Sequence, residues 1–477
     1  MKINPRTLLV LAIAAIVATP ATEASAQATA QRQGPTGLFG ASNSDAGARQ
    51  TLDLTLSSTQ GYDSDLGPKP GTATVLGGPE STGYSTLLVG GGEYAWQIRR
   101  VQLRATGTST MRYLRPLDDL YASTRSLSHT AGVGLFARLP KRTSLLVNQT
   151  ATYSPSYLYN LFPQAPSSVP GDAPPATPDY GVSGFESRTY GTATTLTHDF
   201  TARSSLLTIA DYQTTDTLGG TQVRRSIGSY GIRGRFSHHL GRNTAALAEY
   251  VYRNSEFQPA TALTTLGTAV EHGVNLGFDY NRRLSASRQL NFGALVGSSI
   301  TIVPDLASAV SPDPSITPDP SIAIAPESTA GSEMSNQYYR RMSGQATVAY
   351  DVARSWKVSA IYRRGVDYIA GFSAPISADR VSTSVSGLLS RRVDIFASAG
   401  YSNGESALNL QGPAFDTYTG DARLRYALTR KFAVYVEYLY YFYDSRGGTP
   451  IAPGISSGLE RKGVRTGLTL RVPAVRR

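Results

Sequence analysis

Between residues 101 and 113 the chain reads Val101-Gln-Leu-Arg-Ala-Thr-Gly-Thr-Ser-Thr-Met-Arg-Tyr113, which alternates apolar or small residues with polar ones. In a β-strand, successive side chains point to opposite faces. One face would therefore carry Leu103 and Met111, and the other would carry Arg104 and Arg112. A strand with two such different faces separates an apolar environment from a polar one.

Short basic turns join segments of this kind at eight places. The first reads Trp96-Gln-Ile-Arg-Arg-Val-Gln-Leu103, and the connections between turns are longer and rich in Gly, Pro, Ser and Asp. The eight lie within residues 96–103, 138–145, 199–206, 239–246, 283–290, 351–358, 389–396 and 427–434. A period of short turn, strand, long connection and strand is typical of an antiparallel meander whose two ends face different surroundings.

The number of strands follows from the turns. Each turn joins two strands, one strand at 50–61 precedes the series, and one at 459–472 follows it. The sequence therefore predicts an all-β chain that forms a transmembrane antiparallel β-barrel over residues 50–473, with about 18 strands. The alternative is 16 strands, because the alternation in Leu206–Tyr212 and Ser382–Leu389 is weak. A soluble β-sandwich also alternates, but it would bury the face that here carries the charges.

Residues 1–26 have the pattern of a secretory signal peptide. Lys2 and Arg6 precede an apolar run at Leu8–Ala18, and Ala24-Ser25-Ala26 has the form of a cleavage site. We expect residues 27–49 to form a periplasmic segment and the exported chain to reach the outer membrane of a Gram-negative cell. No later segment has the roughly 18 consecutive apolar residues of a membrane helix.

The long connections are expected on the extracellular side. The two largest span residues 156–184 and 303–336, and both are rich in proline. Aromatic residues at the start of the first, in Tyr153–Phe162, could belong to an outer aromatic girdle or fold inward. We favour the girdle.

The net charge of +11 excludes few partners by itself. Nucleic acid is not expected, because the chain carries an export signal and no nucleic-acid motif. The charge could contact the lipids and lipopolysaccharide of the outer membrane, or line a basic pore. We expect Arg and Lys of the short turns to reach lipid headgroups.

A set of charged residues within the strands falls on the polar face. A charge on the lipid face costs about 2–4 kcal/mol at the bilayer midplane, so alternation directs these groups into the barrel. Two interpretations stay open: these groups pair across strands and hold the barrel in shape, or they give the lumen a surplus of positive potential. The candidate pore-lining residues are Arg104, Arg112, Arg233, Arg235, Glu249, Asp279, Arg363, Asp421, Arg423, Arg425 and Glu437.

No catalytic, metal-binding or cofactor-binding residue is predicted. The chain has 5 histidines and no cysteine, and it lacks the Gly-x-Ser-x-Gly, His-Glu-x-x-His and Walker motifs. An enzyme is therefore the third of three functional hypotheses, and no disulfide can form.

Residues 205–290 and the final third, with their Tyr-rich strands, resemble the β-barrel porin-2 type of outer-membrane protein. Gly61-Tyr-Asp-Ser-Asp65, Tyr153-Ser-Pro-Ser-Tyr157 and Asn160-Leu-Phe-Pro163 add to a resemblance of pattern that covers most of the mature chain. Such proteins are often associated with exopolysaccharide systems, which would imply a role in polymer passage.

Two functional hypotheses lead. The first is a porin-like channel for the passive or gated passage of solutes, such as an anionic solute or an exopolysaccharide, because barrels this wide leave an aqueous channel. The second is a structural or surface-interaction barrel whose lumen is occluded.

Overall fold

The computed structural model describes residues 49–64, 82–117, 124–154, 185–219, 222–257, 267–304, 336–352, 355–367, 375–407, 414–446 and 458–476. These residues form 18 strands joined into one sheet. The strands are β1 (Gln50–Asp63), β2 (Gly83–Ile98), β3 (Val101–Pro116), β4 (Thr124–Leu139), β5 (Thr143–Ser154), β6 (Phe185–Asp199), β7 (Ser204–Gly219), β8 (Gln222–His239), β9 (Thr244–Phe257), β10 (Gly267–Arg283), β11 (Gln289–Pro304), β12 (Asn336–Asp351), β13 (Lys357–Asp367), β14 (Ile376–Ser390), β15 (Val393–Ser406), β16 (Ala414–Ala427), β17 (Phe432–Arg446) and β18 (Gly458–Arg476).

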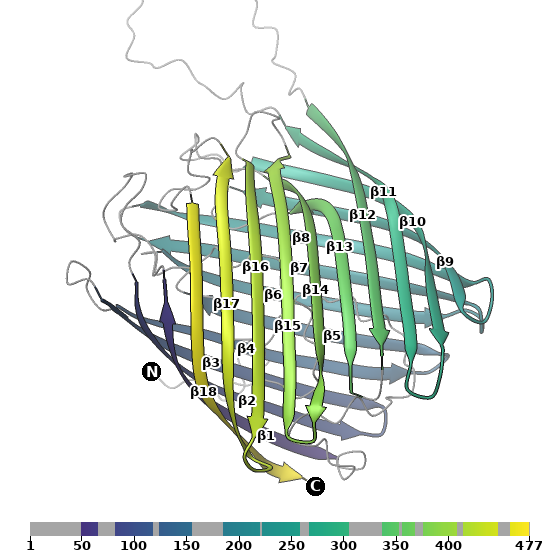
Figure 1. Cartoon of the computed structure of the whole chain (residues 1–477). Helices are drawn as coiled ribbons and strands as arrows, with labels where there is room; N and C mark the ends of the chain where they lie inside the picture. Colours follow the sequence, from purple (N-terminus) through teal and green to yellow (C-terminus); the bar gives the residue numbers. More distant parts are fainter. Residues whose placement is uncertain are drawn as a thin grey trace, which may run out of the picture.

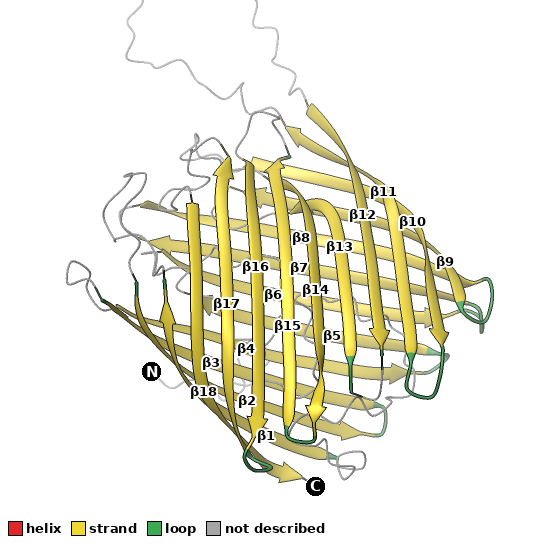
Figure 2. Cartoon of the chain, viewed as in Figure 1, coloured by secondary structure: helices red, strands yellow, loops and turns green. Residues whose placement is uncertain are grey.

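The sheet closes on itself. Each strand pairs antiparallel with the next along the chain, and β1 also pairs with β18, from Thr51–Arg476 to Asp63–Gly463. The result is a meander barrel (Figures 1 and 2). The predicted fold class is confirmed, and so is the count of 18 strands over the alternative of 16. In the described part of the chain, no helix is long and apolar enough to cross a bilayer.

All eight short turns lie where the sequence predicted them. They gather at one end of the barrel (Figure 2). The turn from β2 to β3 consists of Arg99 and Arg100 alone, and Arg99 has a φ of 46°. Lys141 and Arg142, between β4 and β5, have φ values of 58° and 60°. Such left-handed residues match the turn to the right-handed twist of the flanking strands. Arg100 therefore belongs to a turn and not to a strand.

The two faces of the sheet differ in polarity. One carries exposed apolar side chains all round the barrel, such as Leu56 (56%), Leu276 (64%) and Val436 (52%). The other carries Ser, Thr, Arg, Asp and Glu. Contacts that skip a whole strand occur on the polar face, for example between Asn275 of β10 and Ser343 of β12. Side chains converge in this way only on the concave side of a curved sheet. The polar face is therefore the inside, and the apolar face is the outside, as a transmembrane barrel requires.

Some sequence expectations need new boundaries, and others fall outside the described residues. The first and last strands are longer than predicted, and the predicted connection 303–336 overlaps the ends of β11 and β12. Residues 206–212 have a clear face after all: Leu206 pairs with Phe236 and Tyr212 with Tyr230, all on the outside. The predicted signal peptide at 1–26, the segment 27–48 and the connections 156–184 and 305–335 lie outside the described residues.

Candidate functional site: the charged inner wall

The candidate site is the inner wall of the barrel. Register places all the candidate residues on the polar face, opposite the exposed apolar rows. They lie on β3 (Arg104, Arg112), β8 (Arg233, Arg235), β9 (Glu249), β10 (Asp279), β13 (Arg363), β16 (Asp421, Arg423, Arg425) and β17 (Glu437). The structure brings several of these groups together with acidic partners. Their role in lining a pore remains a prediction.

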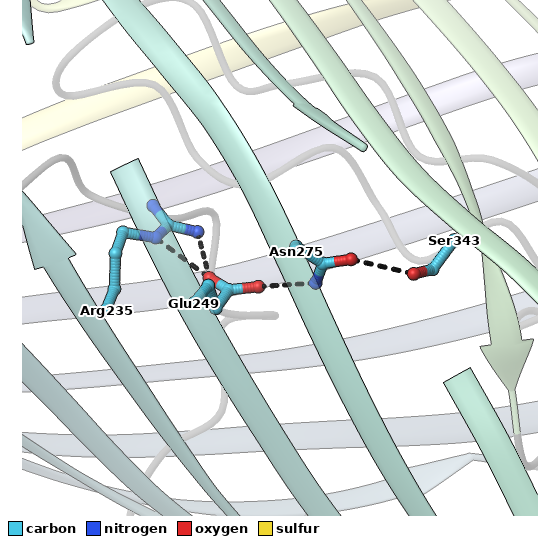
Figure 3. Close-up of polar contacts among 4 residues, drawn as sticks. All are labelled: Arg235, Glu249, Asn275 and Ser343. Carbon is cyan, nitrogen blue, oxygen red and sulfur yellow. Dashed lines mark hydrogen bonds and ion pairs between the residues drawn. The ribbon is translucent and has the colours of Figure 1, made fainter. Parts of the chain in front are cut away.

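A chain of hydrogen bonds crosses the wall from β8 to β12 (Figure 3). The Arg235 guanidinium donates to Glu249, with Nε 2.8 Å from Oε2. The other Glu249 oxygen accepts from the Asn275 side-chain amide at 3.0 Å. The Ser343 hydroxyl then donates to Asn275 Oδ1 at 2.7 Å. Glu249 is only 6% exposed. A charged group this buried needs such partners, because desolvation would otherwise disfavour it.

Gly297 lets the hydrogen bonds between β10 and β12 pass over β11. It lies on β11, between Asn275 of β10 and Ser343 of β12, and its register partners are those two residues. A Cβ at Gly297 would collide with Asn275 Oδ1 and with the Val274 carbonyl oxygen. The absence of a side chain on β11 therefore opens the path by which β10 and β12 are linked across the inner wall.

A second charged group lies on β15 to β17. Arg425 and Asp394 form a buried ion pair, in which Arg425 Nε lies 3.2 Å from each carboxylate oxygen. Arg423 is the register partner of Glu437, and its guanidinium lies 5.8 Å from the centre of the Phe396 ring. Nearby, Asp421 accepts a hydrogen bond from Ser398 at 3.2 Å. Buried pairs such as Arg425–Asp394 stiffen the wall more than they attract solutes.

Arg104 of β3 and Arg363 of β13 are more accessible than Arg425 of β16. Arg104 contacts Glu93 at 2.8 Å, and its side chain is 59% exposed. Arg363 contacts Asp367 at 3.5 Å and is 46% exposed, whereas Arg425 is 5% exposed. Asp367 also meets Arg380, at 3.0 Å. Arg104 and Arg363 are therefore the candidate residues that a solute inside the barrel could reach.

The closure of the barrel is a third charged region. Asp63, at the end of β1, is fully buried between Arg461 at 2.9 Å and Arg465 at 3.3 Å, both from β18. Further along the same seam, Arg471 contacts Asp53 at 2.9 Å. We call these five residues the closure cluster. They link the first and last strands of the chain, which have no turn between them.

Tyr435 adds a bridge across the same seam. Its ring lies over Gly467 of β18, where a Cβ would overlap it, and its hydroxyl hydrogen-bonds to Thr59 of β1. A glycine under an aromatic ring is a recurrent device for pinning neighbouring strands. Strands β17, β18 and β1 are thereby held together by one side chain.

The inner wall carries charged groups that could bind solutes. Arginines alternate with carboxylates, which suits solutes that carry charge or hydrogen-bonding groups. Among the described residues, no group of three or more His, Asp and Glu is arranged to hold a metal ion. Of the histidines, His129 and His272 lie on the outer face, so neither joins the inner carboxylates.

Sequence reasoning missed several members of these groups. Asp394, Asn275 and Ser343 occupy the polar face of their strands, but alternation alone does not tell which polar residues meet. The residues of the closure cluster are also far apart in the chain. A signal existed for Arg235 and Glu249 and for Arg423 and Glu437, because each pair flanks one short turn in register.

No family model and no curated protein matches the chain. Solved structures that resemble the fold include Pseudomonas aeruginosa OccK7 (OpdD), at 9% identity and a TM-score of 0.42, which covers 90% of this chain and 100% of its own. Acinetobacter baumannii OccAB4 has 10% identity, a TM-score of 0.39 and coverages of 89% and 98%. The E. coli K12 ferric-catecholate import receptor Fiu has 10% identity, a TM-score of 0.41 and coverages of 88% and 81%. Similarity at this level carries no argument about function, so the resemblance to the porin-2 type stays a hypothesis.

Proposed function

We propose that this chain is an outer-membrane channel through which solutes cross, either passively or under the control of a gate. The observation that carries the proposal is the closed ring of 18 strands with an apolar outer face and a charged inner face. Barrels of this size have room for an aqueous channel, whereas eight-stranded barrels are filled by their own side chains. A soluble protein rarely leaves so much apolar surface exposed.

The apolar outer face also supports placement of the barrel in the outer membrane. Exposed Leu and Val form the outer face, and Tyr side chains such as Tyr84 (55%), Tyr113 (43%) and Tyr338 (67%) stand towards the end remote from the short turns. Aromatic girdles at the bilayer interfaces are typical of outer-membrane barrels. The predicted signal peptide is consistent with this placement.

The first test is conductance. Folded protein, verified by its shift in electrophoretic mobility on heating, should give discrete single-channel currents in planar bilayers. Heat-denatured protein from the same preparation serves as the control. Absence of current from the folded protein would contradict the proposal. It would favour the second hypothesis, a structural barrel with an occluded lumen.

The finer proposal is a preference for anionic solutes, an acidic polysaccharide among them. It is supported by the accessible guanidinium groups of Arg104 and Arg363. Arg363→Gln should lower the anion preference, measured as the reversal potential under a salt gradient. Arg364→Gln is the matched control, because Arg364 is the next residue, is 42% exposed and faces outward. Equal shifts of the reversal potential in both variants would show that the anion preference does not arise from charges in the lumen.

A further inference from the structure

A hollow of about 320 Å³ lies on the outer face of β4, β5 and β6. Its lining includes side chains that alternation places on the lipid-facing side: His129 and Ala131 of β4, Ala151 and Tyr153 of β5, and Arg188 and Tyr190 of β6. The volume is at the lower end of the range of small-molecule sites. Nothing in the proposed channel activity requires a hollow on this side of the wall.

The hollow has an apolar floor and a polar rim. Ala131 pairs with Ala151, which pairs with Tyr190, so two methyl groups lie where neighbouring rows carry larger side chains. One row further towards the outer end, His129 pairs with Tyr153, which pairs with Arg188. The His129 and Tyr153 rings are stacked, with centroids 6.1 Å apart. Small residues on the periplasmic side and long polar residues on the extracellular side leave this hollow open to the lipid; we call it the recess.

The rim stands at the headgroup level of the membrane. Tyr153 is the penultimate residue of β5 and Arg188 the fourth of β6, both at the end remote from the short turns. Long connections and this end of the strands face the cell exterior in outer-membrane barrels. The alanines lie one row deeper, where acyl chains begin. The recess is therefore placed to take a headgroup and the top of its acyl chain together.

Charge at the rim is mixed. Arg188 presents a planar guanidinium, which binds phosphate through two parallel hydrogen bonds. Glu186 and Asp216 face the same side, and Glu186 accepts a hydrogen bond from the Tyr153 hydroxyl. A headgroup that carries only phosphate would be repelled by these carboxylates. One that combines phosphate with hydroxyl groups matches both, because the hydroxyls can donate to the acids.

We propose that this recess binds a phosphorylated glycolipid of the outer leaflet, with the phosphate on Arg188, the sugar hydroxyls near Glu186, and an acyl chain over Ala131 and Ala151. The inference rests on the membrane placement given under the proposed function. It adds a binding site on the outside of the barrel to the channel within it, and it would fix the orientation of β4 to β6 in the leaflet.

Native mass spectrometry of the folded protein in detergent tests the site. Added bis-phosphorylated lipid A should remain bound to the wild type, and the same lipid without phosphates should bind at least tenfold more weakly. Arg188→Gln should lower lipid A binding about tenfold, the equivalent of ~1.4 kcal/mol. Ala151→Leu should have a similar effect, because the larger side chain fills the floor.

Two substitutions elsewhere on the outer face are the controls. Arg364→Gln removes an exposed outward arginine of β13, and Ala422→Leu enlarges an exposed alanine of β16. Equal loss in Arg188→Gln and Arg364→Gln would overturn the proposal, as would retention of the dephosphorylated lipid. A second copy of the chain seated on the recess would appear as a dimer that lipid A does not displace, which would also overturn it.

Conductance separates this inference from the proposed function. Arg188 and Ala151 face away from the lumen, so their variants should conduct as the wild type does. A conducting barrel that binds no lipid A would refute only the site. A barrel that binds lipid A but carries no current would refute only the channel.

Discussion

Replacement of Asp63 by alanine should lower the free energy of unfolding by about 3–5 kcal/mol, the usual cost of breaking a buried ion pair from one side. Asp63 is fully buried, and its removal leaves Arg461 and Arg465 without their shared carboxylate in a site that is almost closed to water. The loss falls on the contact between β1 and β18, on which closure of the barrel depends. Urea unfolding from lipid vesicles, followed by tryptophan fluorescence, measures it.

Asp53→Ala is the matched control for this prediction. Asp53 lies on the same strand and pairs with Arg471 of β18, also at 2.9 Å, but the two side chains are 22% and 20% exposed. Water can solvate Arg471 after the substitution, so the cost should be about 1 kcal/mol or less. Asp63→Asn should fall near Asp63→Ala, because charge rather than shape is lost. Equal effects of Asp63→Ala and Asp53→Ala would show that burial does not set the strength of the closure cluster.

The sequence predicts most of the fold because the two signals that define a barrel are local. Alternation assigns each strand residue to a face, and a short turn fixes the register of the two strands that it joins. Arg235 and Glu249 illustrate this. Arg235 lies four residues before His239 and Glu249 four residues after Ala245, and His239 pairs with Ala245 beside the turn, so their pairing follows from counting. Arg423 and Glu437 are similarly placed about the turn 428–431, whereas Arg104 meets Glu93 diagonally because its register partner is Ala95.

Contacts across the long connections do not follow from the sequence. Arg425 and Asp394 belong to strands joined at the other end of the barrel, where the length of the connection sets no register. The closure cluster is harder still, because Asp63 and Arg461 lie nearly the whole chain apart. Their meeting depends on the number of strands and on the stagger with which the ring closes. Charge pairing within the lumen is thus partly a local property and partly a property of the complete ring.

Gly297→Ala should destabilise the barrel by about 3 kcal/mol, at the upper end of the usual cost of overpacking. A methyl group at this position of β11 would meet the Val274 carbonyl oxygen and Asn275 Oδ1 at less than van der Waals contact. The strands β10 and β11 would have to separate, or Asn275 would have to give up its bonds to Glu249 and Ser343. Glu249 would then keep its ion pair with Arg235 but lose its bond to Asn275. Because the inner wall would be less rigid, single-channel currents should also become noisier.

Gly107→Ala supplies the contrast. Gly107 is also a strand glycine, on the outer face of β3, but nothing lies within 4 Å of its Cβ position. The added methyl group should be neutral or stabilise the protein by up to about 1 kcal/mol, since alanine restricts the unfolded chain. Neither glycine has a left-handed φ, so backbone strain does not distinguish them. If the two variants unfold at the same urea concentration, the glycine of β11 is not what allows Asn275 to reach Ser343. If only Gly297→Ala is destabilised, the missing side chain on β11 determines whether polar residues of β8, β9, β10 and β12 form one continuous network.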